Sequence, residues 1–134
     1  MKSWLCLCAL SVALAGAAAS ASQPTVESKF GPFVNDGATP YRIRVKSAGH
    51  LDARYVAPQT HCASVIIHFL VDGRQRAVTG AVAPGQDSGF VSLGHLTTGP
   101  HRLSVRPEGV RGGCVDNGMS SWGGTVYLRG VLAH

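Results

Sequence analysis

Residues 63–79 read ASVIIHFLVDGRQRAVT, and the fold class of the protein depends on this stretch. Residues 63–71 carry apolar side chains at both odd and even positions, which is typical of a central strand that is buried on both faces. Asp72-Gly73 is a preferred pair for a tight hairpin turn. We therefore expect residues 76–79 to return beside the first strand.

Strand patterns lie on either side of this hairpin. Residues 41–46 alternate strictly, with Tyr41, Ile43 and Val45 on one face and basic side chains on the other, and residues 101–106 alternate in the same way. Further strands are expected at residues 90–93 and 125–132 and, with weaker patterns, at 25–29 and 51–56. No window of a dozen residues keeps a helical apolar period free of Gly and Pro, so helix is at most a turn or two.

Turn signals separate these strand segments every 8–12 residues, which favours an antiparallel sandwich or barrel. The chain has 134 residues, enough for one domain with a modest core. We expect the sandwich domain over residues 41–134. Residues 23–40 contain three prolines and are expected to be a loosely ordered or edge-strand segment that leads into it.

Three motifs within residues 65–105 resemble the middle strands of bacterial immunoglobulin-like domains. They are F-x-V-D-G at 69–73, A-P-G-x-x-S-G at 83–89 and L-G-x-L-x-x-G-x-H-x-L-x-V at 93–105. The resemblance implies an all-β, antiparallel, immunoglobulin-like sandwich of about seven strands. It implies no particular ligand, because this fold carries many unrelated functions.

The N-terminal segment has the pattern of an export signal. Lys2 is its only charge, residues 4–14 are apolar apart from Ser11, and Ala19-Ser20-Ala21 fits a cleavage site between small residues. The apolar run is about half of the roughly 20 residues that a membrane-spanning helix needs. We expect residues 1–22 to be a cleaved signal peptide, with a secreted or periplasmic mature chain that has no membrane span.

The cysteines agree with export. Cys6 and Cys8 fall within the signal segment, which leaves Cys62 and Cys114 in the mature chain. An even number of cysteines in an exported chain predicts a disulfide, and two cysteines allow one intramolecular pairing. We expect a structural Cys62–Cys114 bridge that tethers the Gly-rich segment around Cys114.

A basic surface is the first candidate binding site. The chain carries 12 Lys and Arg against 7 Asp and Glu, and removal of Lys2 with the signal leaves a net charge of +4. Side chains that share the outward parity of two strands form the candidate set: Arg42, Arg44, Lys46, Arg102 and Arg106. If their strands share a sheet face, they could bind an acidic polysaccharide, lipid headgroups or an acidic protein. The alternative is an ordinary solvated face that also discourages aggregation at a strand edge.

Trp122 is the second candidate. It lies in the irregular stretch of residues 107–124, which is long for a connection without a function. An exposed Trp122 could stack on a sugar ring or insert into a partner. The alternative, which we favour, is that Trp122 closes one end of the core.

Catalytic motifs are weak. Thr60-His61-Cys62 and Asp87-Ser88-Gly89 are similar to the histidine and serine motifs of trypsin-like proteases, but the chain is too short for the two barrels of that family. The carboxylates sit mostly beside Gly, Ser or Asn, as turn residues do. We predict no catalytic residue and no enzyme activity.

Metal and cofactor motifs are absent. The six histidines form no H-x-H or H-x-x-x-H pair and no cluster with cysteine, so the sequence predicts no metal site and no cofactor. Whether histidines on paired strands converge on a metal is left open. Nucleic acid is not an expected partner, since aromatic and basic residues do not interleave.

The preferred hypothesis is an exported, non-enzymatic binding or adhesion-type accessory module that recognises an anionic glycan or surface. Two alternatives stay open. One is a small secreted hydrolase whose site residues converge only in the fold, and the other is a module that binds another exported protein or has a structural role.

Overall fold

The computed structural model describes residues 26–35, 39–113 and 122–132. Its elements are eight strands: β1 (Val26–Asn35), β2 (Thr39–Val45), β3 (Gly49–Val56), β4 (Val65–Val71), β5 (Arg74–Val78), β6 (Val91–Leu96), β7 (Gly99–Gly109) and β8 (Trp122–Gly130). Each strand predicted from the sequence overlaps one of them. The predicted signal peptide, residues 1–22, lies outside the described residues.

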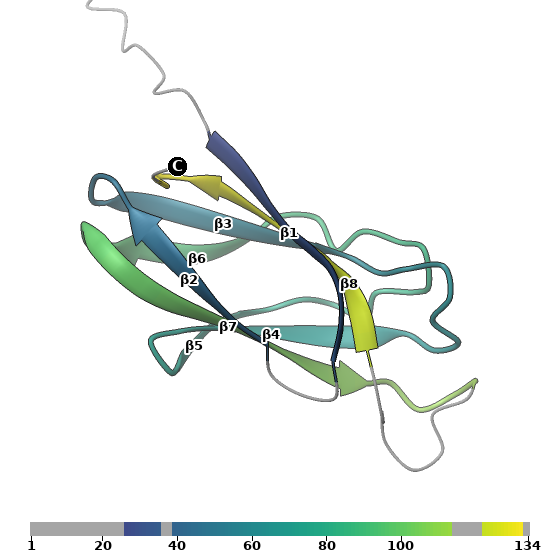
Figure 1. Cartoon of the computed structure of the whole chain (residues 1–134). Coiled ribbons are helices and arrows are strands. Elements are labelled where there is room, and N and C mark those ends of the chain that lie inside the picture. The colour runs from purple at the N-terminus through teal and green to yellow at the C-terminus, as the bar shows by residue number, and fades with distance from the viewer. Residues whose placement is uncertain (1–25, 36–38, 114–121, 133–134) are drawn as a thin grey trace, which may run out of the picture.

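The strands form two four-stranded antiparallel sheets that pack face to face (Figure 1). One sheet, which we call sheet A, has the order β1-β8-β3-β6, and the other, sheet B, has the order β2-β7-β4-β5. The predicted all-β class with two antiparallel sheets is therefore confirmed. Eight strands in two such sheets, with the first strand beside the last, form a sandwich of the jelly-roll type.

The immunoglobulin-like arrangement expected from residues 65–105 is wrong. Immunoglobulin sheets pair the first strand with the second, whereas here β1 pairs with β8, and β4–β5 is the one described pair that is consecutive in the chain. The reason lies in the short connections. Two residues join β6 to β7, yet these strands belong to opposite sheets. Alternation and turn residues in the sequence do not distinguish such a crossing from a hairpin.

The core lies between the two sheets and follows the alternation of the strands. In β4, the residues Val65, Ile67, Phe69 and Val71 are fully buried, while the residues between them are partly exposed. The same parity places Leu103 and Val105 of β7 in the core. The outward positions of β2 and β7 are therefore left for polar and charged side chains, and this placement creates the candidate site.

The end of β7 differs from the prediction. Residues 107–109, expected to begin an irregular loop, continue the strand beside β4, with Pro107 opposite Ile67. Among the described residues, the pairing of β2 with β7 ends at Val105, and beyond this residue the described partner of β7 is β4 alone. Proline fits such an edge because it donates no ladder hydrogen bond.

Candidate functional site

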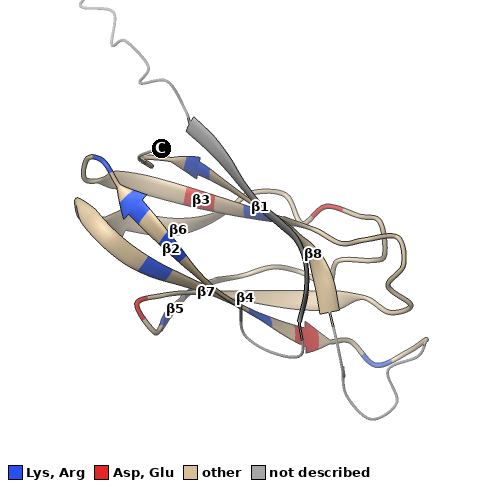
Figure 2. Ribbon diagram, in the orientation of Figure 1, with Lys and Arg blue, Asp and Glu red and all other residues tan. Residues whose placement is uncertain are grey.

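Basic residues occur along β2 and β7, two neighbouring strands of sheet B (Figure 2). We call Arg42, Arg44, Lys46, Arg102 and Arg106 the basic face; all five are exposed. Arg42 and Arg44 belong to β2, Lys46 follows its end, and Arg102 and Arg106 belong to β7. Because β2 and β7 are neighbours, the condition that the two basic strands share one sheet face is met.

The strand register brings two of the five residues together. Arg42 stands directly opposite Arg102, whereas Arg44 is opposite Pro100. Arg106 is opposite His68 of β4, and its four-residue separation from Arg102 corresponds to about 13 Å along the strand. The structure therefore assembles Arg42 and Arg102 into one pair and leaves Arg106 apart.

The cations of the two sheets differ in their partners. On sheet A, Arg54 pairs with Asp87 at 2.8 Å and Arg129 pairs with Asp52 at 2.9 Å. No residue of the basic face forms an ion pair with another residue in the described parts of the chain. The positive charge of sheet B is therefore left facing solvent.

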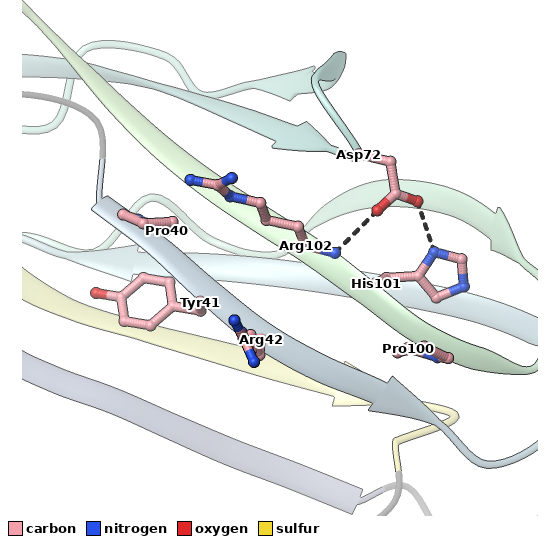
Figure 3. Close-up of a pocket in the computed structure, with 7 residues that line it drawn as sticks. All are labelled: Pro40, Tyr41, Arg42, Asp72, Pro100, His101 and Arg102. Atoms are coloured by element: carbon pink, nitrogen blue, oxygen red, sulfur yellow. Dashed lines mark hydrogen bonds and ion pairs between the residues drawn. The ribbon is translucent and has the colours of Figure 1, made fainter.

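A surface depression of about 550 Å³ lies at the Arg42–Arg102 pair. Its walls are formed by Pro40, Tyr41, Arg42, Asp72, Pro100, His101 and Arg102. Figure 3 shows the two arginines on neighbouring strands, with Asp72 reaching in from the turn between β4 and β5. Burial raises the pKa of Tyr41 to about 12, so its phenol stays neutral and provides a largely apolar wall.

At this depression, the carboxylate of Asp72 forms hydrogen bonds with two residues of β7. One carboxylate oxygen, Oδ1, accepts a hydrogen bond from the backbone N–H of Arg102 at 2.9 Å. The other, Oδ2, lies 2.7 Å from Nδ1 of His101. Nε2 of the same ring lies 2.8 Å from the carbonyl oxygen of Thr97, so the ring is fixed at both nitrogens.

The Asp72–His101 contact shifts the pKa of both groups. The hydrogen bond to Asp72 raises the pKa of His101, helped by the Thr97 carbonyl and opposed by burial and by Arg76. The pKa of Asp72 is lowered, chiefly by its hydrogen bonds to His101 and to the Arg102 backbone. When His101 is protonated, its charge offsets the carboxylate of Asp72 in the depression, and the raised pKa extends the pH range over which it does so.

Asp72 and His101 were not predicted as site residues. The sequence assigned Asp72 to a turn, which is correct: its φ of 50° and the Gly73 that follows form the β4–β5 turn. Its contact with His101 depends on the pairing of β4 with β7, 29 positions apart in the chain. No local pattern indicates that pairing.

Trp122 is not a surface residue. It is 2% exposed, and its ring packs at a tilt against Tyr55 with the ring centres 6.1 Å apart. An exposed stacking role for Trp122 is therefore wrong, and the alternative that it closes the core is correct. The reason is that Trp122 begins β8 with its side chain on the inner face of sheet A.

Ser88 and His61, the residues of the protease-like motifs, form hydrogen bonds with backbone groups. Ser88 Oγ accepts a hydrogen bond from the N–H of Tyr55 at 2.9 Å and donates one to the carbonyl of Gly89 at 2.7 Å. His61 Nε2 accepts a hydrogen bond from the N–H of Gly123 at 3.1 Å, and burial lowers the pKa of the His61 ring. Both side chains therefore stabilise loop conformations.

The residues just before Cys114 lie close to the segment that contains Cys62. The N–H of Val110 donates a hydrogen bond to the carbonyl of Ser64 at 3.0 Å. Gly113 has a φ of +57° and lies so close to Cys62 that a Cβ at position 113 would collide with the Cys62 carbonyl oxygen. Cys114 lies outside the described residues, so the Cys62–Cys114 bridge stays a prediction.

Within residues 26–35, 39–113 and 122–132, no three His, Cys, Asp or Glu side chains gather in a way that could hold a metal ion. The same ranges contain no helix with the length and hydropathy needed to cross a membrane.

The chain shows little sequence similarity to known proteins. No protein-family model matches the chain, and no curated protein sequence matches it. Among solved structures, the native structure of a family 35 carbohydrate binding module from Clostridium thermocellum is similar to it, with 9% sequence identity and a TM-score of 0.46. The match covers 78% of this chain and 98% of that one. A similarity this low does not transfer function from one protein to the other.

Proposed function

We propose that the protein is a non-enzymatic binding module that recognises an anionic glycan at the depression between β2 and β7. The observation that carries this proposal is the direct opposition of Arg42 and Arg102, whose guanidinium groups form no ion pair within the described parts of the chain. Like charges placed directly opposite one another destabilise a sheet. An anion between them converts that repulsion into two attractions.

The chemistry of the pair selects the type of anion. A guanidinium presents N–H donors in a planar fork that matches the oxygens of a carboxylate or a sulfate. Uronic acids and sulfated sugars carry these groups on a ring. The exposed rings of Pro40 and Pro100 and the neutral Tyr41 border the arginines, and they suit the apolar faces of a sugar.

The size of the depression also suits a saccharide. Its volume of about 550 Å³ falls within the range of about 300–1,000 Å³ that is usual for small-molecule sites. It lies on the outer face of sheet B, where a longer chain could place one of its units in it. Arg44 and Arg106 lie outside the depression on the same face, where they would attract neighbouring acidic units.

Export is part of the proposal. A signal peptide over residues 1–22 would deliver the mature domain to a secreted or periplasmic location, where acidic polysaccharides occur. A Cys62–Cys114 disulfide would be stable there. The approach of Gly113 to Cys62 supports this pairing.

The test uses the mature chain with polygalacturonate, dextran sulfate and neutral dextran as probes. We expect saturable binding to one or both acidic polymers and none to dextran, with affinity falling as salt rises. The double variant Arg42→Ala plus Arg102→Ala should lose at least about tenfold in affinity, since it removes two charge-assisted hydrogen-bond donors.

The matched control is Arg74→Ala plus Arg111→Ala, which removes the same charge from exposed positions outside the lining of the depression. It should retain most of the affinity. Equal losses in both double variants would mean attraction by net charge without a site. Failure to bind either acidic polymer at low salt would contradict the proposal and favour a protein partner.

A further inference from the structure

Sheet A carries a pair of histidines that the proposed glycan site does not involve. His50 of β3 stands directly opposite His95 of β6 in the strand register. Both side chains are exposed on the outer surface of the sheet. Their ring centres are 5.6 Å apart, with the planes at 90° in an edge-to-face arrangement.

This spacing is close to that of two imidazoles bound to one metal ion. A metal–nitrogen distance of about 2.0–2.1 Å and tetrahedral angles place the two ring centres about 5 Å apart. Directly opposed residues hold their Cβ atoms about 4.5–5.5 Å apart, so the strand pairing supplies the required separation. Small side-chain rotations would complete the site without movement of the backbone.

The surroundings decide how many ligands the protein supplies. Asp52 lies two residues along β3 on the same face, but its carboxylate is engaged by Arg129 at 2.9 Å. No third His, Cys, Asp or Glu joins the two histidines among the described residues. Water would fill the remaining coordination positions, which makes an open and exchangeable site.

We propose that His50 and His95 form a two-histidine site for a divalent transition-metal ion. Imidazole nitrogen suits Zn²⁺ and Cu²⁺, whereas Mg²⁺ and Ca²⁺ prefer oxygen ligands. Cu²⁺ should bind more tightly than Zn²⁺, in the usual order of affinities for such ligands. The site belongs to sheet A and the basic face to sheet B, so the two proposals stand or fall separately.

The experiment is titration calorimetry of the untagged mature chain with ZnCl₂, CuCl₂ and MgCl₂. We expect saturable binding of one Zn²⁺ or Cu²⁺ per chain and no binding of Mg²⁺. His50→Ala and His95→Ala should each weaken this binding about 100-fold, because each leaves a single ligand and removes the gain from linking two.

His68→Gln is the matched control. It replaces a strand histidine on sheet B, which is hydrogen-bonded to Gln75 and Glu108, and it should bind metal as the parent chain does. Thermal melting of each variant without metal checks that all of them fold. Metal affinity that is unchanged in both alanine variants, or the absence of Zn²⁺ and Cu²⁺ binding by the parent chain, overturns the proposal.

Discussion

The hydroxyl of Tyr55 donates a 2.6 Å hydrogen bond to the carbonyl oxygen of Gly123, which joins the end of β3 to the start of β8. Tyr55 is fully buried, and burial raises its pKa, so the hydroxyl keeps its proton at all ordinary pH values. The bond fixes β8 against β3 at the end where the chain enters the sheet.

Replacement of Tyr55 by Phe should therefore destabilise the fold. The Gly123 carbonyl would lose its donor in a buried setting, which costs about 1–3 kcal/mol. Urea unfolding followed by fluorescence measures the free-energy difference. Tyr127→Phe, at a partly exposed position of β8, is the control and should change little. A Tyr55→Phe chain as stable as the parent would contradict the role given to this bond.

Gly124→Ala should destabilise the protein as well, by a different cause. Gly124 has a φ of +139°, and a Cβ there would meet Tyr55 Cε2 at 2.5 Å and the Val56 carbonyl oxygen at 2.7 Å. Strained backbone and overpacking each cost about 1–3 kcal/mol. Thermal melting compares it with Gly80→Ala, where a Cβ has nothing within 4 Å. If Gly124→Ala and Gly80→Ala have the same melting temperature, the close approach at Gly124 does not restrict which side chain that position can hold.

Trp122→Ala removes the largest fully buried side chain of the described core. We expect a loss of about 3–5 kcal/mol in unfolding free energy, as for other large aromatic residues replaced in a core. Ligand binding should fall only in proportion to the unfolded fraction, because Trp122 is absent from the walls of the depression. If the Trp122→Ala chain lost ligand binding but kept the unfolding free energy of the parent, Trp122 would have to be part of the binding site.

The Asp72–His101 pair should stabilise the fold within a defined pH window. The pKa of His101 is raised above 6.5, so its contribution is complete below that pH and is lost as pH rises through the folded-state value. The pKa of Asp72 is lowered below 3.8, so its contribution is complete above that pH and is lost as pH falls through the folded-state value. Both contributions are present together from pH 3.8 to 6.5.

Asp72→Asn tests this window. Its destabilisation relative to the parent should be larger near pH 5 than near pH 9, and about 1 kcal/mol or less, since the Asp72 side chain is half exposed. Chemical unfolding at the two pH values gives the difference. Asp52→Asn is the control, because its partner Arg129 stays charged across this range. Equal effects of Asp72→Asn at both pH values would rule out coupling to His101.

The sequence predicted where the strands lie along the chain, but not which strands pair with one another. Alternation in residues 41–46 and 101–106 predicted which side chains of β2 and β7 face outward, because side-chain direction is a local property with a period of two. The opposition of Arg42 and Arg102 depends on register, which is set by contacts between distant segments. The same limit explains why Asp72 was assigned to a turn and His101 to a strand, without any sign that they touch.

The resemblance to immunoglobulin-like domains misled for a related reason. Its motifs describe turns and strand interiors, and the connection at Thr97 and Thr98 is as short as a hairpin loop. Here that connection crosses from β6 in one sheet to β7 in the other. The choice between returning and crossing is made by which apolar faces meet across the sandwich.

The position of β8 between β1 and β3 has a consequence for how the chain reaches its native state. Three of the four strands of sheet A are synthesised early or midway, yet two of them lack their shared neighbour until residues 122–130 have appeared. Sheet A is therefore completed last, when β8 pairs with β1, and strands this distant in sequence pair slowly. Until residues 122–130 join them, β1 and β3 each lack a strand partner on the edge that β8 occupies in the finished sheet.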